Sequence, residues 1–296
     1  MMPLNTKYHK RVNKPSFYLI ICGLLLAGYG CSGTHKGQKC MTSIRAGFSE
    51  RIPEREQGAP AGSVFMEQTR TLSYAERQLA AVREFIQGNI PSRLRELEPL
   101  SFISEEGDIL ILLVTRDYLA VGTEGDFVRM PLSLPSAKTI AKEYNMYLPT
   151  PEIVNAIYEQ AKVRLEPQPM EPGPEMRSGD YYLRHNRLIE GQMSGSPEGL
   201  IAGHKKDVVI SLRMSGQPDR VPIYGWHRKA GDPIQPLSLV HGATYEDYSH
   251  GLRLVSPVAC LNGEPVPLGN LFDDPVWGSF LSNEPGLDPQ ELSWQE

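Results

Sequence analysis

The 296-residue chain has little of what marks several large classes of protein. It carries 30 Lys and Arg against 35 Asp and Glu, a formal net charge of -5. Without a basic excess it cannot neutralise many phosphates, so we expect no nucleic-acid partner. It also lacks the Gly-x-Ser-x-Gly and His-Glu-x-x-His patterns, and no Lys-Ser or Lys-Thr follows the glycines of residues 191–203. These absences argue against a serine nucleophile elbow, a helical zinc-protease site and a phosphate-binding loop.

Cysteine is also scarce, with 4 in the whole chain. Cys22 and Cys31 fall in or beside an export signal, described next, which leaves Cys40 and Cys260 in the mature chain. Two thiols allow one disulfide in an oxidising compartment, but Cys40 lies in a segment expected to be a tether, where a bridge is unexpected. Cys260 precedes a Leu-Asn-Gly turn, and we interpret it as a small buried hydrophobe and not as a nucleophile.

The apolar run at the N-terminus is too short to cross a bilayer. It covers residues 17–30 and follows a basic segment that contains Lys7, Lys10, Arg11 and Lys14. A membrane-spanning helix needs roughly 20 apolar residues, so the pattern predicts an export signal over residues 1–30.

The segment Ala27-Gly28-Tyr29-Gly30-Cys31 resembles the bacterial lipobox, in which the cysteine becomes the lipidated N-terminus after cleavage. The resemblance implies lipidation of Cys31 and a lipoprotein anchored to a membrane of the bacterial cell envelope, in the periplasm or at the cell surface. Gly28 and Tyr29 depart from it, since that family usually has Leu and a small residue there. Simple secretion and an uncleaved anchor are the alternatives.

Composition divides the rest of the chain into four parts and a tail, and predicts an α+β fold. N-terminal helices and a hairpin are followed by a mainly antiparallel β C-terminal half, and the two halves form either one domain or two. The parts are a polar flexible tether (31–70), a helical and hairpin scaffold (71–165), a Pro-rich connection (166–180), a histidine-rich β module (181–285) and a tail (286–296).

Capping patterns predict several helices. Ser73 and Glu76 form a capping box ahead of apolar residues at helical spacing up to Ile86. Ser136 is expected to cap a second helix, and Thr150 before a proline predicts the start of a third. A further helix is expected over residues 181–190, with His185 and Asn186 as an exposed or locally satisfied polar pair.

Branched apolar runs predict the strands. Residues 109–114 and 118–121, separated by Arg116 and Asp117, are expected to pair as a hairpin with residues 127–130 as a third strand. Three more strands are expected in the C-terminal half, over residues 208–212, 221–226 and 252–258.

Four of the 7 histidines fall in polar or glycine-bearing phrases near the ends of these strands: His204, His227, His241 and His250. Loops at strand ends hold functional side chains on a rigid base, so the clustering predicts a cleft. Asp207 is placed to orient His204 and raise its basicity, unless the pair belongs to a solvated turn. His227 follows Trp226 and either lines the cleft or caps a sheet edge.

His241-Gly242 and Ser249-His250-Gly251-Leu252-Arg253 resemble the signature of L,D-transpeptidases of the YkuD type. In that family a His-Gly precedes a Ser-His-Gly-Cys-Ile-Arg run, and the enzyme crosslinks peptidoglycan through the cysteine. Here Leu252 stands where the cysteine belongs, so no thioester can form at this position. The resemblance implies that His241 and His250 act as acid, base or ligand and that Arg253 clamps a carboxylate.

These patterns lead to one preferred function and two alternatives. The preferred one is an exported envelope lipoprotein that hydrolyses or transfers a bond in a cell-wall polymer of the peptidoglycan type. Its rival is a non-catalytic lipoprotein that binds a glycan or a protein partner, and in the third case the histidines only satisfy loops. The candidate catalytic residues are His204, Asp207, His227, His241 and His250, and the candidate substrate-binding residues are Lys205, Trp226, Tyr248 and Arg253.

Zinc is the candidate cofactor, because catalytic zinc takes three nitrogen or oxygen ligands and keeps one position open. The candidate ligands are His204, Asp207, His241 and His250. None of these residues has the tight spacing of a helical zinc motif, so a metal site would depend on their meeting in the fold.

Overall fold

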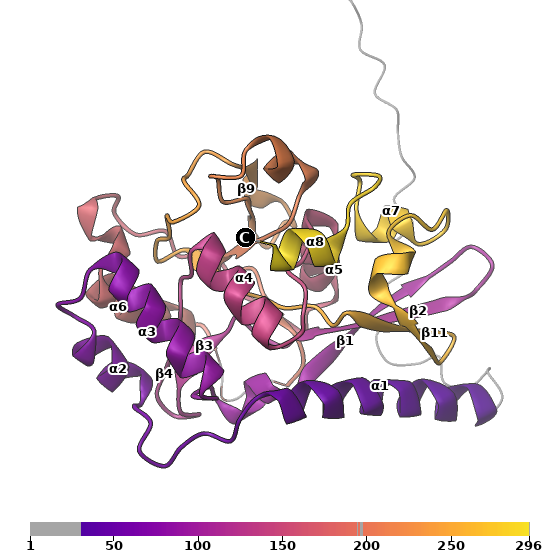
Figure 1. The fold of residues 1–296 in the computed structure, drawn as a ribbon, viewed down its shortest axis with the longest axis horizontal. Coiled ribbons are helices and arrows are strands. Elements are labelled where there is room, and N and C mark those ends of the chain that lie inside the picture. The colour runs from indigo at the N-terminus through magenta and orange to yellow at the C-terminus, as the bar shows by residue number, and fades with distance from the viewer. Residues whose placement is uncertain (1–30, 194, 196–197, 296) are drawn as a thin grey trace, which may run out of the picture.

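The protein is described by a computed structural model, which covers residues 31–193, 195 and 198–295 (Figure 1). The export signal expected over residues 1–30 lies outside this range, and so does the side chain of Cys31. Helices alternate with short, mainly antiparallel strands. This confirms the α+β class.

The first sheet has the strand order β1-β2-β11-β12, and all its pairings are antiparallel. Its strands are β1 (Leu97–Ile103), β2 (Ile109–Thr115), β11 (Val258–Leu261) and β12 (Glu264–Pro267). The predicted hairpin is therefore wrong in its pairing, since the partners of β2 are β1 and β11. Pro99 hides β1 in the sequence, because proline is tolerated in an edge strand but reads as a strand breaker.

The segment expected to complete that hairpin forms a small ribbon of its own. β3 (Ala120–Gly122) pairs with β4 (Phe127–Arg129). The residues between β2 and β3, among them Asp117, run through the protein interior instead of forming an exposed turn.

The second sheet has the order β10-β7-β8-β9. β10 runs parallel to β7, and the other pairs are antiparallel. The expected strands at 208–212, 221–226 and 252–258 are shifted or shortened in this sheet and its surroundings. Its members are β7 (Lys206–Val208), β8 (Ile223–His227), β9 (Pro233–Ser238) and β10 (His250–Gly251), and a separate parallel pair joins β5 (Val163–Arg164) to β6 (Ile201–Ala202).

The capping predictions are confirmed at two helices and wrong at a third. Ser73 and Glu76 form the capping box, and the Thr150 side chain accepts a hydrogen bond from the Ile153 amide. Ser133 and not Ser136 caps α4, so this helix begins earlier than expected. The long helices after the first are α3 (Tyr74–Ile86), α4 (Leu134–Glu143), α5 (Pro151–Gln160) and α6 (Gly179–Glu190), and the short ones are α2 (Gly62–Gln68), α7 (Gly278–Leu281) and α8 (Pro289–Trp294).

The segment expected to be a flexible tether begins with a helix, α1 (Cys31–Arg51), which runs along one edge of the molecule (Figure 1). Cys40 forms a disulfide with Cys260 of β11, with their Cα atoms 6.1 Å apart. Phe48 and Ile52 are buried in the core. The prediction of a flexible tether is wrong here. It was based on the scarcity of apolar residues, but the Cys40–Cys260 disulfide, which was not expected in a tether, supplies much of the attachment of α1.

One hydrophobic cluster contains residues from α1, from residues 71–165 and from residues 181–285. The scaffold and the histidine-rich module therefore share a core. Among the described residues, no helix is both long and apolar enough to cross a membrane.

Candidate functional site

The histidine phrases meet at the parallel pair β7–β10, where Lys206 lies opposite His250 and Asp207 opposite Gly251. A Cβ atom at Gly251 would lie 2.4 Å from the buried Tyr118 ring, so glycine at this position leaves room for that ring against β10. Successive residues of a strand point to opposite faces. Lys205 and Asp207 thus contribute to one polar cluster, and Lys206 with His250 to another.

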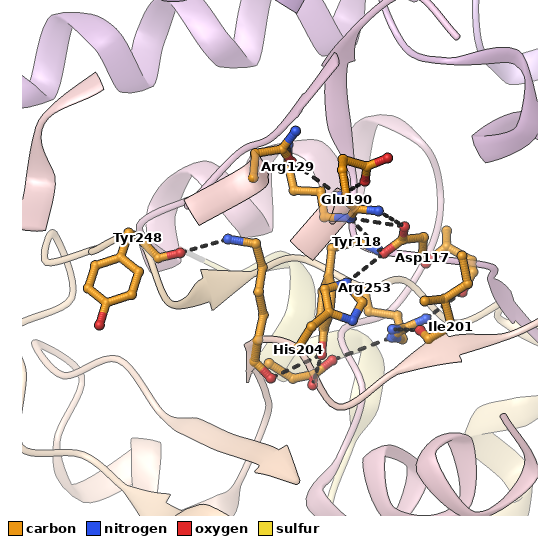
Figure 2. Close-up of polar contacts among 12 residues, drawn as sticks. Asp117, Tyr118, Arg129, Glu190, Ile201, His204, Tyr248 and Arg253 are labelled. Carbon is orange, nitrogen blue, oxygen red and sulfur yellow. Dashed lines mark hydrogen bonds and ion pairs between the residues drawn. The ribbon is translucent and has the colours of Figure 1, made fainter. Parts of the chain in front are cut away.

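The first cluster is a buried ion network, and it centres on Asp117 (Figure 2). Arg129 approaches the Asp117 carboxylate through Nη2 at 2.7 Å and through Nε at 3.0 and 3.1 Å. The His204 Nε2 lies 3.0 Å from the Asp117 Oδ1, and the Arg129 Nη1 reaches Glu190 at 2.6 Å. Burial alone would raise the pKa of Asp117, but Arg129 and His204 hold it well below its usual value. Asp117 is therefore a buried carboxylate with its charge matched.

Burial lowers the pKa of His204 to about 4, although Asp117 acts in the opposite direction. At neutral pH a neutral His204 therefore donates its Nε2 hydrogen to Asp117. The carboxylate that orients His204 is therefore Asp117 and not Asp207. Asp117 lies in a segment that the sequence predicted to be a turn. His204 Nδ1 has no hydrogen-bond partner among the described residues.

Asp207 belongs to the other end of the same network. It accepts a hydrogen bond of 2.7 Å from the Tyr118 hydroxyl and lies 3.6 Å from the Arg253 Nε. Burial raises the pKa of Asp207 to about 6, against the charge of Arg253. The two Nη atoms of Arg253 donate to the carbonyls of Thr115 and Ile201 at 2.9 and 2.8 Å. Arg253 is 1% exposed, so the expected carboxylate clamp is committed to the protein's own backbone.

Lys205 and Tyr248, two candidate substrate-binding residues, are also committed internally. The Lys205 ammonium donates to the Tyr248 carbonyl at 2.7 Å, and burial lowers the Lys205 pKa to about 7. The Tyr248 hydroxyl accepts from the Met170 amide at 2.7 Å. Both residues are at most 3% exposed. Neither side chain is open to a polymer in this conformation.

His227 lies in a third environment. Its Nε2 is 3.0 Å from the Asn155 Oδ1, and its ring stacks on Tyr158 with centroids 4.6 Å apart. Burial lowers the pKa of His227 to about 4. The ring therefore packs against α5 at the end of β8, which is an interior strand, so His227 does not cap a sheet edge.

The second cluster, here called the His250 site, consists of Lys206, Trp226, His241, Tyr245, Asp247 and His250. His250 is fully buried, and neither ring nitrogen has a hydrogen-bond partner among the described residues. Its ring lies edge-on to Tyr245 at 5.9 Å, and Tyr245 stacks on His241 at 4.1 Å. One tyrosine therefore contacts both histidines of the transpeptidase-like signature.

Asp247 fixes the loop that presents these rings. Its Oδ1 accepts hydrogen bonds from the Ser249 amide at 2.8 Å and hydroxyl at 2.5 Å, and its Oδ2 accepts from Tyr245 at 3.1 Å. Burial opposes the Asp247 charge, but His250, Ser249 and Lys206 together lower its pKa. Burial lowers the pKa of His250 to about 4. At neutral pH the site therefore holds a neutral imidazole beside an ionised carboxylate.

The Trp226 backbone is strained. This residue has φ +58° and follows Gly225 at φ +106°, and a non-glycine residue in the left-handed region costs of order 1–3 kcal/mol. The conformation places the indole ring 5.0 Å from the Lys206 Nζ and 6.4 Å from the Tyr248 ring. Its Nε1 is buried without a hydrogen-bond partner in the described chain. Strain retained beside unpartnered polar atoms is typical of functional sites.

The site is partly open. Lys206, His241 and Tyr245 are half-buried, whereas Trp226, Asp247 and His250 are buried.

The structure separates the candidate residues into three groups. It gathers Trp226, His241 and His250 in the His250 site and leaves His227 against α5. It places His204, Lys205, Asp207, Tyr248 and Arg253 in or beside the ion network. Within the described ranges no group of three His, Cys, Asp or Glu side chains is placed to share a metal ion, so the candidate zinc ligands do not converge.

Sequence reasoning missed Asp117, Arg129 and Lys206 as site residues. Arg129 carried a signal, since a charged residue near the end of the apolar run 127–130 is unusual in a buried strand. Asp117 carried none, because Arg-Asp between two apolar runs is equally typical of a turn. His185 and Asn186 are buried and not an exposed pair, and Asn186 bonds Arg129 and the Phe127 carbonyl.

Two cavities lie away from both clusters. One of about 270 Å³ lies between α1 and β11, and the second, of about 380 Å³, lies beside α1 near Arg95. No side chain of the His250 site lines either of them.

Comparison with known proteins adds no relative: no family model, curated protein or solved structure matches the chain. Its function is therefore argued from the two polar clusters alone.

Proposed function

We propose that the protein is an exported envelope lipoprotein that hydrolyses or transfers a bond in a peptidoglycan-type polymer, with His250 as its acid–base group. The observation that supports this is the His250 imidazole, fully buried with both nitrogens unpartnered in a site that also has half-buried residues. Buried polar groups in folded proteins are nearly always hydrogen-bonded. His185 is equally buried with two unpartnered nitrogens, but only His250 of this pair lies beside the Asp247 carboxylate and the half-buried Tyr245 ring.

The chemistry follows from the ionisation states. A neutral His250 beside ionised Asp247 takes a proton from an attacking water or hydroxyl group, and the carboxylate stabilises the imidazolium that forms. The imidazolium of His250 then gives this proton to the leaving group, and His241, whose pKa burial lowers, is a neutral ring stacked on Tyr245 and not the acid. The Ser249 hydroxyl is held by Asp247 and makes no hydrogen bond with His250, so Ser249 is not the nucleophile. The rings of Tyr245 and Trp226 provide faces on which sugar or peptide groups pack.

The Cys40–Cys260 disulfide supports export, because disulfides persist in oxidising compartments. A lipid on Cys31 would hold the folded domain close to the membrane, since α1 begins at this residue and leaves no flexible spacer. The proposed substrate would then be the part of the envelope nearest to that membrane.

The test is product release from purified sacculi, followed by liquid chromatography and mass spectrometry of the soluble fragments. We expect His250→Asn to lower the rate by about 10²–10⁴-fold, the usual contribution of a positioned acid or base. His35→Asn, at an exposed position of α1, is the matched control and should leave the rate unchanged. Equal product profiles for wild type and His250→Asn, with both folded, would refute the catalytic role.

A non-catalytic envelope protein that binds a glycan or a partner is the second candidate. One observation favours it: five of the nine predicted catalytic and substrate-binding residues are committed to the closed region around the ion network. In that case the wild type would bind sacculi in a pulldown and release no fragment.

A further inference from the structure

We propose that the ligand of the His250 site presents a carboxylate to the Lys206 ammonium, and that this carboxylate belongs to the peptide part of the polymer. The inference rests on the proposed function and names the substrate group that the site would select. It is carried by a lysine that the protein holds in place without a direct ion pair, although the charge of Asp247 acts on it.

Lys206 makes no side-chain hydrogen bond and no ion pair with any residue of the described ranges; the contact of its Nζ there is with the Trp226 ring, at 5.0 Å. Burial lowers the Lys206 pKa, and the charge of Asp247 counteracts part of this effect. A half-buried ammonium without an acid partner is costly, so its retention calls for an anion supplied from outside.

The neighbouring charged side chains are each held by other contacts. Arg177 pairs with Glu246 at 2.9 Å, and Arg220 donates to the Val240 carbonyl at 2.7 Å. The three hydrogen bonds from Ser249 and Tyr245 occupy the Asp247 carboxylate. Lys206 is thus the one cation among the six residues of the His250 site, and it has no ion pair within the described ranges; a single charge matches one carboxylate.

The position of Lys206 is fixed by the fold. Its amide donates to the Ser249 carbonyl at 2.7 Å, and in the register of the sheet it lies between Gly225 and His250. The strained backbone of Trp226 places the indole against its side chain. A carboxylate on Lys206 would therefore be adjacent to His250, the proposed base, and to the half-buried rings of His241 and Tyr245. This geometry selects a charged peptide segment over an uncharged glycan.

The test uses the full-length protein with His250→Asn, which blocks turnover, and measures binding by isothermal titration calorimetry. The probes are a disaccharide tetrapeptide with free carboxylates, the same molecule with its carboxylates amidated, and a glycerol phosphate oligomer. A charge-assisted hydrogen bond corresponds to about a 10–100-fold change in affinity. We expect amidation to weaken binding by that factor, and Lys206→Met to weaken the free acid equally and remove the difference between the two peptides.

Lys206→Arg keeps the charge and should restore most of the preference, while Lys229→Met, at an exposed lysine beyond β8, should change nothing. Unfolding temperatures of all variants establish that they fold. If the free and the amidated peptide bind equally well to the protein with Lys206 and to the protein with Lys206→Met, the inference is overturned and the proposed substrate survives. If the glycerol phosphate oligomer binds more tightly than the free acid, the carboxylate assignment is overturned. If no peptide binds, the proposed function itself fails.

Discussion

At the scale of residues, His204 and His250 are both fully buried but differ in their hydrogen bonds. His204 is bonded to Asp117, which Arg129 also contacts, so its role in holding the network is evident. His250 is equally buried and has no such partner. The sequence predicted a cluster of histidines, but it could not assign their partners, because Asp117 is 87 positions from His204. Contacts of that separation depend on the complete fold.

The pH dependence of stability should reveal His250. Its pKa is about 4 in the folded protein, below the ordinary 6.5, so between these values the unfolded state binds more protons. The stability contributed by the neutral imidazole is thus complete above pH 6.5 and is lost as the pH falls towards 4, by up to about 1.4 kcal/mol per pH unit. Because the pKa of buried Asp207 is raised, this residue makes the unfolding free energy fall as the pH rises between about 4 and 6. This effect is the same in the wild type and in a variant at His250.

We therefore expect His250→Asn to reduce the slope of the unfolding free energy against pH by up to about 1.4 kcal/mol per pH unit between pH 4.5 and 6, the slope that one bound proton produces. Urea unfolding at half-unit steps of pH measures it. A slope identical to that of the wild type would show that the His250 imidazole is not buried in its neutral form.

At the scale of elements, local signals were predictable and pairing was not. The capping box at Ser73 and Glu76 was found because its residues are three apart. The pairing of β2 with β1 was missed because Pro99 disguises β1. α1 was missed because its polar sequence buries few side chains, and the covalent bond from Cys40 to β11 compensates for this. A disulfide that closes a separation of 220 residues is not recognisable from two cysteines alone.

Removal of this disulfide should loosen α1. The double variant Cys40→Ser, Cys260→Ser is expected to lose about 2–5 kcal/mol of unfolding free energy, because the bond restricts a long loop in the unfolded chain. Limited proteolysis should then cleave within residues 31–51, where few other buried contacts hold the helix. Reduced wild-type protein is the control and should behave like the double variant. Unchanged stability and protease resistance would contradict the view that this bond attaches α1.

At the scale of the whole molecule, one core unites what composition divided into a scaffold and a histidine-rich module. The α+β class followed from alternating helical and strand-like patterns and is confirmed. The clustering of the candidate histidines could be foreseen in part, since His241 and His250 both contact Tyr245. Their separation from the ion network could not be foreseen, because it depends on which face of β7 each side chain occupies.

The most direct measurement compares His250→Leu with His204→Leu in unfolding free energy and sacculus turnover, on the same preparations. Both imidazoles are fully buried, and only His204 has a hydrogen-bonded carboxylate. The account predicts that His204→Leu loses about 1–3 kcal/mol, since Asp117 loses a donor, while His250→Leu keeps or gains stability and loses turnover. If His250→Leu instead unfolds the protein as readily as His204→Leu, or retains full turnover, His250 is a structural residue and the central claim is wrong.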